Sequence, residues 1–463
     1  MVHPTYPQTM SILYQIAVAI VRLAAPLFSV GDSKLARGMA GRRHADRLLA
    51  TWGDVVRDRD RPVVWFHAPS VGEGLQAMAV KDALLEARPD VQVVYTFFSP
   101  SAESLAGRFG ADVATYLPWD LRGPLTRVLR SVEPSLIVFT KTEVWPVLVA
   151  EAGRHGIPVA MVGATVTEGA GRGGRLARTF LRATWATLDL VCANTEADAE
   201  RLSGLGVRRS ALVSTGDPGI DSAASRFDDT PRSAPYLDPF RASSRPTIVA
   251  GSTWRSDEDV LLPALRQVRD AAPALRVIIA PHEPHADSVA DLVVRLREDG
   301  WGAGTLTDVE RASGGSGDAR GGSGAHGGAA RERGVDEPLD AVVVDRVGAL
   351  AHLYGVAAIS YVGGGFHAEG LHSVLEPAAA ETPVVFGPRH GNTRAASDLL
   401  REGGAKIATS SDELAGVMTE WLLDEELRSR AGQAAVDYIQ RHRGAADRAA
   451  ARLRQLLDDG PSA

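Results

Sequence analysis

The chain has 463 residues, enough for two or three domains, since single hydrophobic cores stop growing beyond about 250–300 residues. Hydrophobic residues make up 45% and charged residues 23% of the sequence, as is ordinary for a folded protein. The net charge of −7 gives no basic field that gathers nucleic acid, so no nucleic-acid partner is expected. The single cysteine, Cys192, excludes an internal disulfide and a cysteine metal cluster.

Residues 10–30 form an almost wholly apolar run that approaches the length of a bilayer span. Gln15, Arg22 and Ser29 are seven apart and share one narrow helical stripe, typical of a helix that lies in a membrane interface or packs its polar edge on protein. A central arginine is costly in a lone span, so the pattern favours a monotopic anchor over a single-pass crossing. A helix buried on the protein itself is the alternative.

A basic collar follows the apolar run and would meet anionic headgroups on the cytoplasmic leaflet of a membrane. No lysine or arginine occurs in residues 1–9 and no small-residue cleavage site follows, so a removable signal is the weaker interpretation. The collar comprises Lys34, Arg37, Arg42, Arg43 and Arg47.

The rest of the chain alternates short apolar runs with helical patterns in two successive series, which predicts two parallel sheets flanked by helices. The strands expected in the first series are residues 63–67, 91–98, 136–140, 159–163, 188–193 and 211–214, with helices at 74–88, 143–155 and 196–205. The strands expected in the second are 247–250, 277–280, 341–344, 358–362, 384–386 and 406–408, with helices at 257–271, 374–380, 395–402 and from 411 to the end.

Two segments interrupt this alternation. Residues 217–245 are rich in proline, serine and aspartate, a composition that resists regular structure and suits an interdomain linker. Residues 311–334 contain nine glycines and no aliphatic side chain larger than alanine, which predicts a disordered insertion. The predicted organisation is therefore an anchor helix and collar (1–50), a first Rossmann-like domain (51–225), a linker (226–245) and a second Rossmann-like domain (246–463).

The stretch from residue 361 to residue 388 is the most informative. An apolar strand runs into three glycines, including Gly364, which let backbone N–H groups approach a bound group closely. The following segment presents His372, the Ser373 hydroxyl and the Glu376 carboxylate, an arrangement that suits a nucleotide. A parallel strand with a glycine-rich turn and a helix packed behind it is the simpler alternative.

Two doubly wound lobes joined by a linker match the GT-B arrangement of glycosyltransferases, in which two Rossmann-like lobes face each other and ligands occupy the cleft. The segment Phe66-His67-Ala68-Pro69-Ser70-Val71-Gly72-Glu73 resembles the His-Ala-x-Ser-Val-Gly-Glu signature of the 3-deoxy-D-manno-octulosonic acid (Kdo) transferases. The resemblance continues in order through residues 116–120, 142–146, 156–159, 195–201, 251–253 and 361–388.

A carboxylate in the turn after a first-lobe strand is suited to take the proton of an acceptor hydroxyl as that oxygen attacks the sugar, and Glu73 has this position. The alternative makes Glu73 a helix-start residue favoured by the helix dipole. The resemblance implies that Glu73 is the general base. It also suggests Ser70 and Gly72, with Arg172, Arg175 and Arg178, as acceptor contacts, although spaced arginines commonly form a solvated face.

The resemblance places the donor nucleotide on the second lobe. It implies contacts from His282, from the turn Val347-Gly348-Ala349, and from Gly364, His372, Ser373 and Glu376. Glu376 suits both ribose hydroxyls, and N–H groups near Gly348 suit the phosphate. No metal or other cofactor is expected, because the CMP leaving group carries one phosphate ester and the sequence shows no metal-ligand cluster.

The chain departs from the family pattern at several positions. His282 replaces an arginine, Thr165 another arginine, Gly219 a lysine, Ser373 an asparagine, and Lys141 the glutamate before Thr-Glu-x-Trp-Pro. Each change removes or alters a fixed charge or amide of the family's site, so the donor and acceptor are less closely defined than the fold.

The resulting hypothesis is a membrane-associated GT-B Kdo transferase of lipopolysaccharide assembly, which transfers Kdo from CMP-Kdo to a lipid A precursor with inversion. A GT-B transferase for another nucleotide sugar and a catalytically silent membrane-associated relative are the alternatives. The sequence leaves open how many Kdo residues are added and the oligomeric state.

Overall fold

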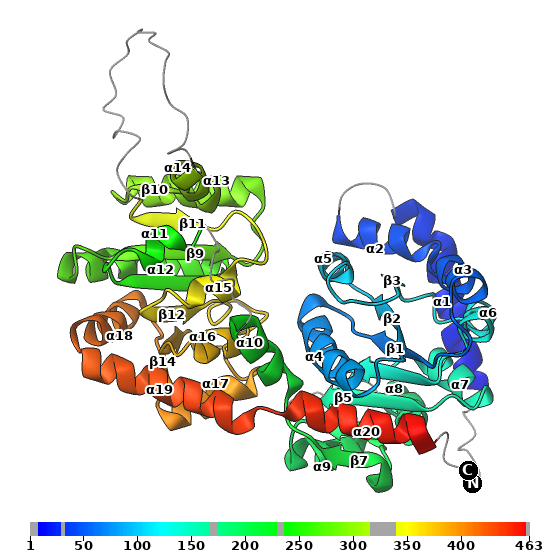
Figure 1. The fold of residues 1–463 in the computed structure, drawn as a ribbon. Coiled ribbons are helices and arrows are strands. Elements are labelled where there is room, and N and C mark those ends of the chain that lie inside the picture. Colours follow the sequence, from blue (N-terminus) through cyan, green and yellow to red (C-terminus); the bar gives the residue numbers. More distant parts are fainter. Residues whose placement is uncertain (1–7, 29–32, 167–174, 229–235, 315–338, 460–463) are drawn as a thin grey trace. The chain divides into compact units, whose positions relative to one another are not determined.

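The computed structural model describes residues 8–28, 33–166, 175–228, 236–314 and 339–459. The chain divides into two compact units. Unit 1 comprises Met1–Ser222 together with His442–Ala463, and unit 2 comprises Ala223–Arg441. Each unit has one parallel sheet with helices on its faces (Figure 1).

The sheet of unit 1 has seven parallel strands in the order β3-β2-β1-β4-β5-β6-β7. Alternate residues of each central strand enter different cores: Trp65 and Ile137 lie in one, Phe66 and Val138 in the other. A sheet covered on both faces needs such continuous apolar strands. The strands are β1 (Val63–His67), β2 (Gln92–Phe97), β3 (Val113–Tyr116), β4 (Leu136–Thr140), β5 (Val159–Ala164), β6 (Leu190–Ala193) and β7 (Leu212–Ser214).

The helices of unit 1 include one from the far end of the chain. They are α1 (Gln8–Phe28), α2 (Lys34–Arg42), α3 (Ala45–Val55), α4 (Val71–Ala87), α5 (Glu103–Ala106), α6 (Arg122–Val132), α7 (Pro146–Arg154), α8 (Arg175–Ala186), α9 (Glu196–Leu205) and α20 (Ala445–Asp459), with the 3-10 turns η1 (Pro100–Ala102) and η3 (Arg209–Ala211). Helix α10 (Pro218–Asp228) begins in unit 1 and ends in unit 2.

The sheet of unit 2 also has seven parallel strands, in the order β10-β11-β9-β8-β12-β13-β14. Its strands are β8 (Thr247–Thr253), β9 (Arg276–Pro281), β10 (Ala303–Thr305), β11 (Ala341–Val343), β12 (Ile359–Val362), β13 (Val384–Phe386) and β14 (Ala405–Ile407). Its helices are α11 (Asp238–Arg241), α12 (Arg255–Ala271), α13 (Ala286–Glu298), α14 (Leu306–Gly314), α15 (Leu350–Tyr354), α16 (Leu375–Ala379), α17 (Arg394–Glu402), α18 (Ser411–Leu423) and α19 (Glu425–His442).

Helix α20 returns to unit 1 and is fixed there by hydrogen bonds. One oxygen of the Asp221 carboxylate accepts from the N–H of Gly444 at 2.6 Å, and the other accepts from the N–H of Ala446 at 2.8 Å. Arg448 donates to the carbonyl of Thr215 at 2.8 Å. Ala449 is fully buried in the unit 1 core. The last helix of the chain is therefore a structural part of the first unit.

The predicted organisation needs three corrections. The second domain does not run to residue 463, because residues from 442 onward belong to unit 1. The expected irregular linker, 226–245, begins inside α10 and contains α11, while 229–235 lie outside the described residues. The glycine-rich insertion, 311–334, overlaps the end of α14, and 315–338 lie outside the description.

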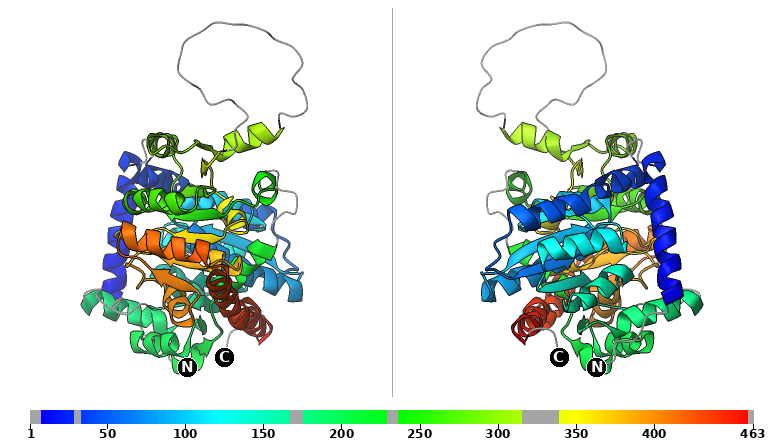
Figure 2. Two further views of the ribbon diagram at one scale, coloured as in Figure 1. Left: turned by 90° about the vertical axis from the view of Figure 1, so that its left-hand side faces the viewer. Right: turned by 90° about the vertical axis from the view of Figure 1, so that its right-hand side faces the viewer.

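Helix α1 runs along one flank of unit 1, where Figure 2 shows it in dark blue. One side packs on the unit: Ala25 is buried, Tyr14 packs against the core, and Gln15 accepts a hydrogen bond from the N–H of Arg122 at 3.3 Å. Within the described residues, no helix is long and apolar enough to cross a membrane. The other side of α1 is apolar and exposed, with Ile12, Leu13, Ile16, Ile20, Val21 and Leu23 each at least 46% exposed.

One residue of the predicted basic collar does not face outward. Arg42 is buried, and its guanidinium carbon lies 3.7 Å from the centre of the Phe98 ring, with Trp119 and Trp145 close by. Burial lowers the pKa of Arg42 to about 10. Arg42 therefore attaches α2 to the sheet and is not available to a headgroup.

Candidate active site

The strand order of unit 1 reverses between β1 and β4, which are neighbours in the sheet although β2 and β3 come between them in sequence. In open parallel sheets, ligands bind outside the carboxyl ends of the strands at such a reversal. Ser70 and Glu73 follow β1, and Lys141 follows β4. The predicted catalytic segment therefore lies where this topology places a site.

Glu73 stands in the first turn of α4, where the helix dipole favours a carboxylate. Ser70, the residue before the helix, donates its hydroxyl hydrogen to one carboxylate oxygen. The Lys141 ammonium lies 3.2 Å from the other oxygen. The Glu73 side chain is 18% exposed, so it is held by two partners and still reachable. Gly72 is exposed beside it, with no atom closer than 4.0 Å to an added Cβ.

Lys141 adopts a left-handed backbone conformation, with φ of 61°. This region is unfavourable for residues with a side chain, and such strain concentrates at functional sites. The N–H of Lys141 donates to the carbonyl of Val162 at 2.9 Å, which ties the strained residue to β5. The sequence analysis treated Lys141 only as the loss of a glutamate, whereas the structure pairs it with Glu73.

A polar and aromatic cluster adjoins this edge of the sheet. The indole N–H of Trp145 donates to Nε2 of buried His67 at 3.1 Å and to Oε1 of Glu143 at 3.0 Å. The other ring nitrogen of His67 lies 3.0 Å from the Thr96 hydroxyl. Phe98, 41% exposed, stacks on Trp145 at 5.5 Å between ring centres. Sequence reasoning did not assign these residues, although the paired aromatic rings at two strand ends were a visible signal.

The arginines suggested as acceptor contacts are not placed. Arg172 lies outside the described residues, as do the side chains of Arg175 and Arg178, which belong to α8. Near Glu73, Gly219 donates its N–H to the Asp217 carboxylate at 2.8 Å. Burial raises the pKa of Asp217, and the charge of Lys141 opposes that rise.

The strand order of unit 2 reverses between β8 and β12, and the glycine turn follows β12 at that point. The buried carboxylate of Asp257, on α12, accepts hydrogen bonds from the N–H groups of Gly364 at 2.8 Å and Phe366 at 3.1 Å. It also accepts from the hydroxyl of Tyr361 at 3.1 Å. Asp257 thus fixes the turn, a role that sequence reasoning missed because it depends on contacts distant in sequence.

The glycines of this turn are required by close backbone approach. A Cβ on Gly363 would lie 2.2 Å from the carbonyl oxygen of Ser252, and one on Gly364 would lie 2.2 Å from that of Gly370. Gly364 also has φ of 90°, which side chains rarely adopt. The triple glycine is therefore explained by packing, and a bound nucleotide is not needed to account for it.

Four rings stack beside the turn. Trp254, directly after β8, lies 4.2 Å from His367 and 4.6 Å from His282 between ring centres. His282 stacks on His372 at 4.3 Å, and Nε2 of His372 accepts from the Trp254 indole at 3.0 Å. Burial, followed by the charges of His282 and His367, lowers the pKa of His372 to about 4. Two predicted donor residues, His282 and His372, are therefore in contact.

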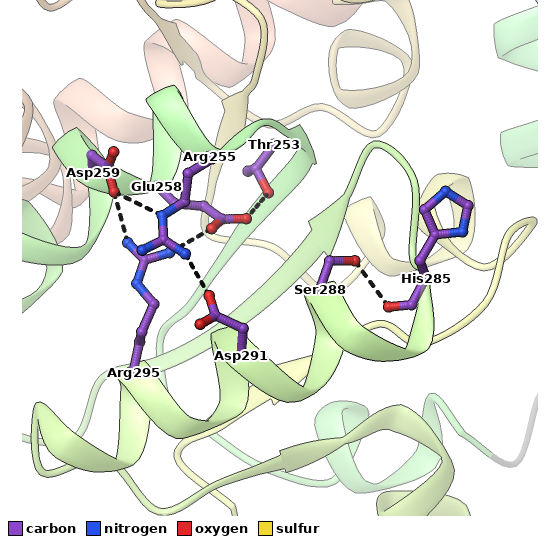
Figure 3. Close-up of polar contacts among 8 residues, drawn as sticks. All are labelled: Thr253, Arg255, Glu258, Asp259, His285, Ser288, Asp291 and Arg295. Carbon is purple, nitrogen blue, oxygen red and sulfur yellow. Dashed lines mark hydrogen bonds and ion pairs between the residues drawn. The ribbon is translucent and has the colours of Figure 1, made fainter.

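The turn that carries His282 is supported by a polar network between α12 and α13 (Figure 3). Arg295 of α13 donates to Glu258 at 2.7 Å and to Asp259 at 2.9 Å, both on α12, and the Thr253 hydroxyl donates to Glu258 at 3.3 Å. The carbonyl of His285, the residue before α13, accepts from the Ser288 hydroxyl at 2.9 Å.

The remaining donor residues lie on α15 and α16. Glu376 forms an ion pair with Arg226, the residue that α10 brings into unit 2. Gly348 has φ of 94° with open space around an added Cβ, Val347 is 70% exposed, and Ala349 precedes α15. Ser373 is exposed, and its hydroxyl accepts from the N–H of Leu375 at 3.3 Å.

These positions form two groups in unit 2, the ring stack with Gly364 and the Glu376 pair near α15. The shared role of Val347–Ala349 and the ring stack stays a prediction. Among the described residues, no three His, Cys, Asp or Glu side chains are arranged to hold a metal ion.

Solved structures share this fold. The UDP-N-acetylglucosamine 2-epimerase of Neisseria meningitidis, solved with UDP-GlcNAc, is 13% identical, with a TM-score of 0.57 over 86% of this chain and 100% of that chain. A glycosyltransferase of Rickettsia africae is 9% identical, with a TM-score of 0.55 over 86% of this chain and 98% of that chain. With two parallel sheets that each carry polar groups at the strand-order reversal, the protein has the two-lobe α/β GT-B fold.

Sequence relatives define the family. Residues 43–221 match the family model of the 3-deoxy-D-manno-octulosonic-acid transferases. The 3-deoxy-D-manno-octulosonic acid transferase of Haemophilus influenzae is 26% identical over 401 residues, 85% of this chain and 86% of that protein. That of Bordetella pertussis is 29% identical over 396 residues, 83% and 85% of the two chains. The chain is thus similar to the Kdo transferases over most of its length.

Proposed function

We propose that the protein transfers Kdo from CMP-Kdo to a lipid A precursor with inversion at the anomeric carbon. A hydroxyl oxygen of the acceptor forms the new bond to that carbon, and the bond from the carbon to the phosphate oxygen breaks. CMP leaves with the bonding electrons, and the hydroxyl proton passes to the Glu73 carboxylate. This reaction needs one base on the acceptor side and a pocket for the nucleotide.

The placement of Glu73 carries the proposal. It is an acidic side chain at the strand-order reversal of unit 1, held by Ser70 and Lys141 while partly exposed. A base must be oriented and reachable, and both conditions are met. The similarity to Kdo transferases supports Kdo as the sugar and CMP as its nucleotide.

Unit 2 would bind the CMP part of the donor. Glu376 has the geometry to accept both ribose hydroxyls, and Arg226 holds its carboxylate. The N–H groups around Gly348, whose surroundings are open, suit the phosphate. The stacked rings of His282 and His372 offer a flat surface to the cytosine.

The acyl chains of the acceptor lie in the membrane, so the enzyme must act at the membrane surface. Helix α1 suits that location. Its exposed apolar side, with Ile16, Ile20 and Leu23, has no cover within unit 1 among the described residues. Lys34 and Arg37 on α2 supply positive charge next in sequence. We place α1 in the cytoplasmic interface of the bacterial inner membrane as a monotopic anchor.

Mass spectrometry of the lipid after incubation with CMP-Kdo and a tetraacylated lipid A precursor tests the proposal. The expected product is heavier by one or more Kdo residues, and the increment gives the number transferred. Glu73→Gln, which removes the base and keeps the side-chain shape, should lower the rate by about 100-fold or more. Glu86→Gln, further along α4, is the matched control.

Three results would contradict the proposal or a part of it. An inactive parent protein whose melting temperature does not respond to CMP favours the catalytically silent relative. A melting temperature raised by a nucleoside diphosphate and unaffected by CMP favours a transferase for another nucleotide sugar. Full activity of Glu73→Gln removes Glu73 as the base.

A further inference from the structure

Lys141 follows β4 and reaches Glu73, which follows β1. Its ammonium lies 3.2 Å from Oε1 of Glu73, and its side chain is 38% exposed. Among the described residues, this is the single cation paired with Glu73 by an ion pair. A cation therefore stands beside the proposed base, on a surface that a ligand can reach.

The backbone of Lys141 adopts a conformation that is energetically unfavourable for a residue with a side chain. Its φ of 61° lies in the left-handed region, where glycine is the favoured residue. The surroundings do not require a lysine for packing, because the side chain is more than one third exposed. Strain kept at the carboxyl end of a strand, with an exposed charge at its tip, is typical of a functional residue.

The chemistry of the donor indicates what the Lys141 ammonium binds. In Kdo, a 2-keto sugar acid, the carboxylate is bonded directly to the anomeric carbon. The acceptor oxygen bonds to this same carbon while its proton moves to Glu73. Two carboxylates, one on the sugar and one on the base, must then approach within a few bond lengths of the same atom, and like charges at that separation repel.

We infer that the Lys141 ammonium binds the carboxylate of the sugar acid at the reacting carbon while paired with Glu73, and so selects an acidic sugar as donor. Lys141 contacts the substrate and takes no proton in this role. Charge-assisted contacts of this kind are strong and specific for an anion. The inference rests on the proposed function and names the residue that distinguishes a sugar acid from a neutral sugar.

Three substitutions of the full-length protein test it. Lys141→Gly removes the ammonium and relieves the left-handed conformation, so the fold should be at least as stable as the parent. Lys141→Met removes the charge and keeps most of the side chain, and Lys141→Arg keeps the charge. Lys406→Met is the matched control, since Lys406 has 37% side-chain exposure and pairs with Glu420 in unit 2.

The expected result is a KM for CMP-Kdo raised by about tenfold or more in the glycine and methionine variants, as for loss of a hydrogen bond to a charged group. The inhibition constant of CMP, which lacks the sugar carboxylate, should stay within about twofold of the parent value. Lys141→Arg should restore most of the affinity for CMP-Kdo, and Lys406→Met should change neither constant.

Two outcomes overturn the inference: an unchanged KM in both charge-removing variants, or a CMP inhibition constant that rises as much as the KM, which would show general damage to the site. A parent protein that transfers no Kdo contradicts the proposed function itself. An active parent whose KM is insensitive to Lys141 contradicts only the role of Lys141, so the two failures are distinguishable.

Discussion

The carboxylate of Asp257 and the N–H of Gly364, more than one hundred positions apart, are joined by a hydrogen bond of 2.8 Å. The same carboxylate accepts from Phe366 and from the Tyr361 hydroxyl. Asp257→Ala leaves these buried donors without a partner, and we expect a loss of about 3 kcal/mol in the free energy of unfolding. Urea denaturation of parent and variant measures it.

The matched control for Asp257 is Asp259, on the same helix. Its side chain is 58% exposed and pairs with Arg255 and Arg295 at the surface. Asp259→Ala should cost less than about 1 kcal/mol. Equal losses for the two alanine variants would mean that the turn does not depend on Asp257.

The lowered pKa of His372 predicts a pH-dependent loss of stability. Its pKa falls from the usual 6.5 to about 4 on folding because of burial, with His282 and His367 facing it. A group whose pKa is lower in the folded state stabilises the fold above pH 6.5, and this stabilisation is lost as the pH falls towards 4. At pH 4.5 the loss should be about 2–3 kcal/mol.

His372→Asn removes the titration and keeps an acceptor for the indole of Trp254. Between pH 7 and pH 4.5, the free energy of unfolding of this variant should fall about 2 kcal/mol less than that of the parent. Unfolding curves in urea at a series of pH values give both numbers. Parallel pH profiles would show that folding does not lower the pKa of His372.

Glu376→Gln should weaken donor binding with little effect on stability. The amide accepts from a ribose hydroxyl less strongly than the carboxylate and loses its ion pair with Arg226. The dissociation constant of CMP, measured by calorimetry, should rise by about tenfold. Glu402→Gln, which breaks the pair of Glu402 with Arg441 elsewhere in unit 2, should leave it unchanged. Equal CMP binding by the Glu376 variant would exclude this residue from the nucleotide pocket.

Charges placed on the exposed side of α1 should release the protein from lipid. Ile20 and Leu23 are 61% and 80% exposed, and burying each in an interface contributes about 1.5–3 kcal/mol. The double variant Ile20→Asp, Leu23→Asp should lose most of its flotation with vesicles containing anionic lipid. Val294→Asp, which changes a 51% exposed residue of α13, is the control. Undiminished flotation of the α1 variant would contradict the anchor.

Sequence patterns predicted most of both sheets because the central strands are continuous apolar runs buried on both faces. The two missed strands, β3 and β10, lie at the sheet edges, where fewer apolar residues are needed. Gly304 in β10 weakens the local signal, because glycine disfavours strands. The return of α20 to unit 1 depends on packing between chain ends, which periodicity does not report.

Only part of the candidate site was predicted, because sequence patterns do not report contacts between residues distant in sequence. Glu73 was found because its motif is local and its strand is adjacent in sequence. The partners that orient the site were missed, because Lys141 and Asp257 reach it through the order of the strands in space. The role of Arg42 was predicted wrongly, since a cation in a basic run gave no sign that aromatic rings would bury it.

The hydrogen bonds between the Asp221 carboxylate and the start of α20 have a consequence during synthesis. Residues 1–222 leave the ribosome long before residues 442–463, although both belong to one unit. Until α20 has been synthesised, the sheet face that receives Ala449 and Leu453 lacks its cover. The nascent unit 1 therefore exposes apolar surface while unit 2 is being synthesised. The fold of unit 1 is completed after that of unit 2, although most of unit 1 is translated first.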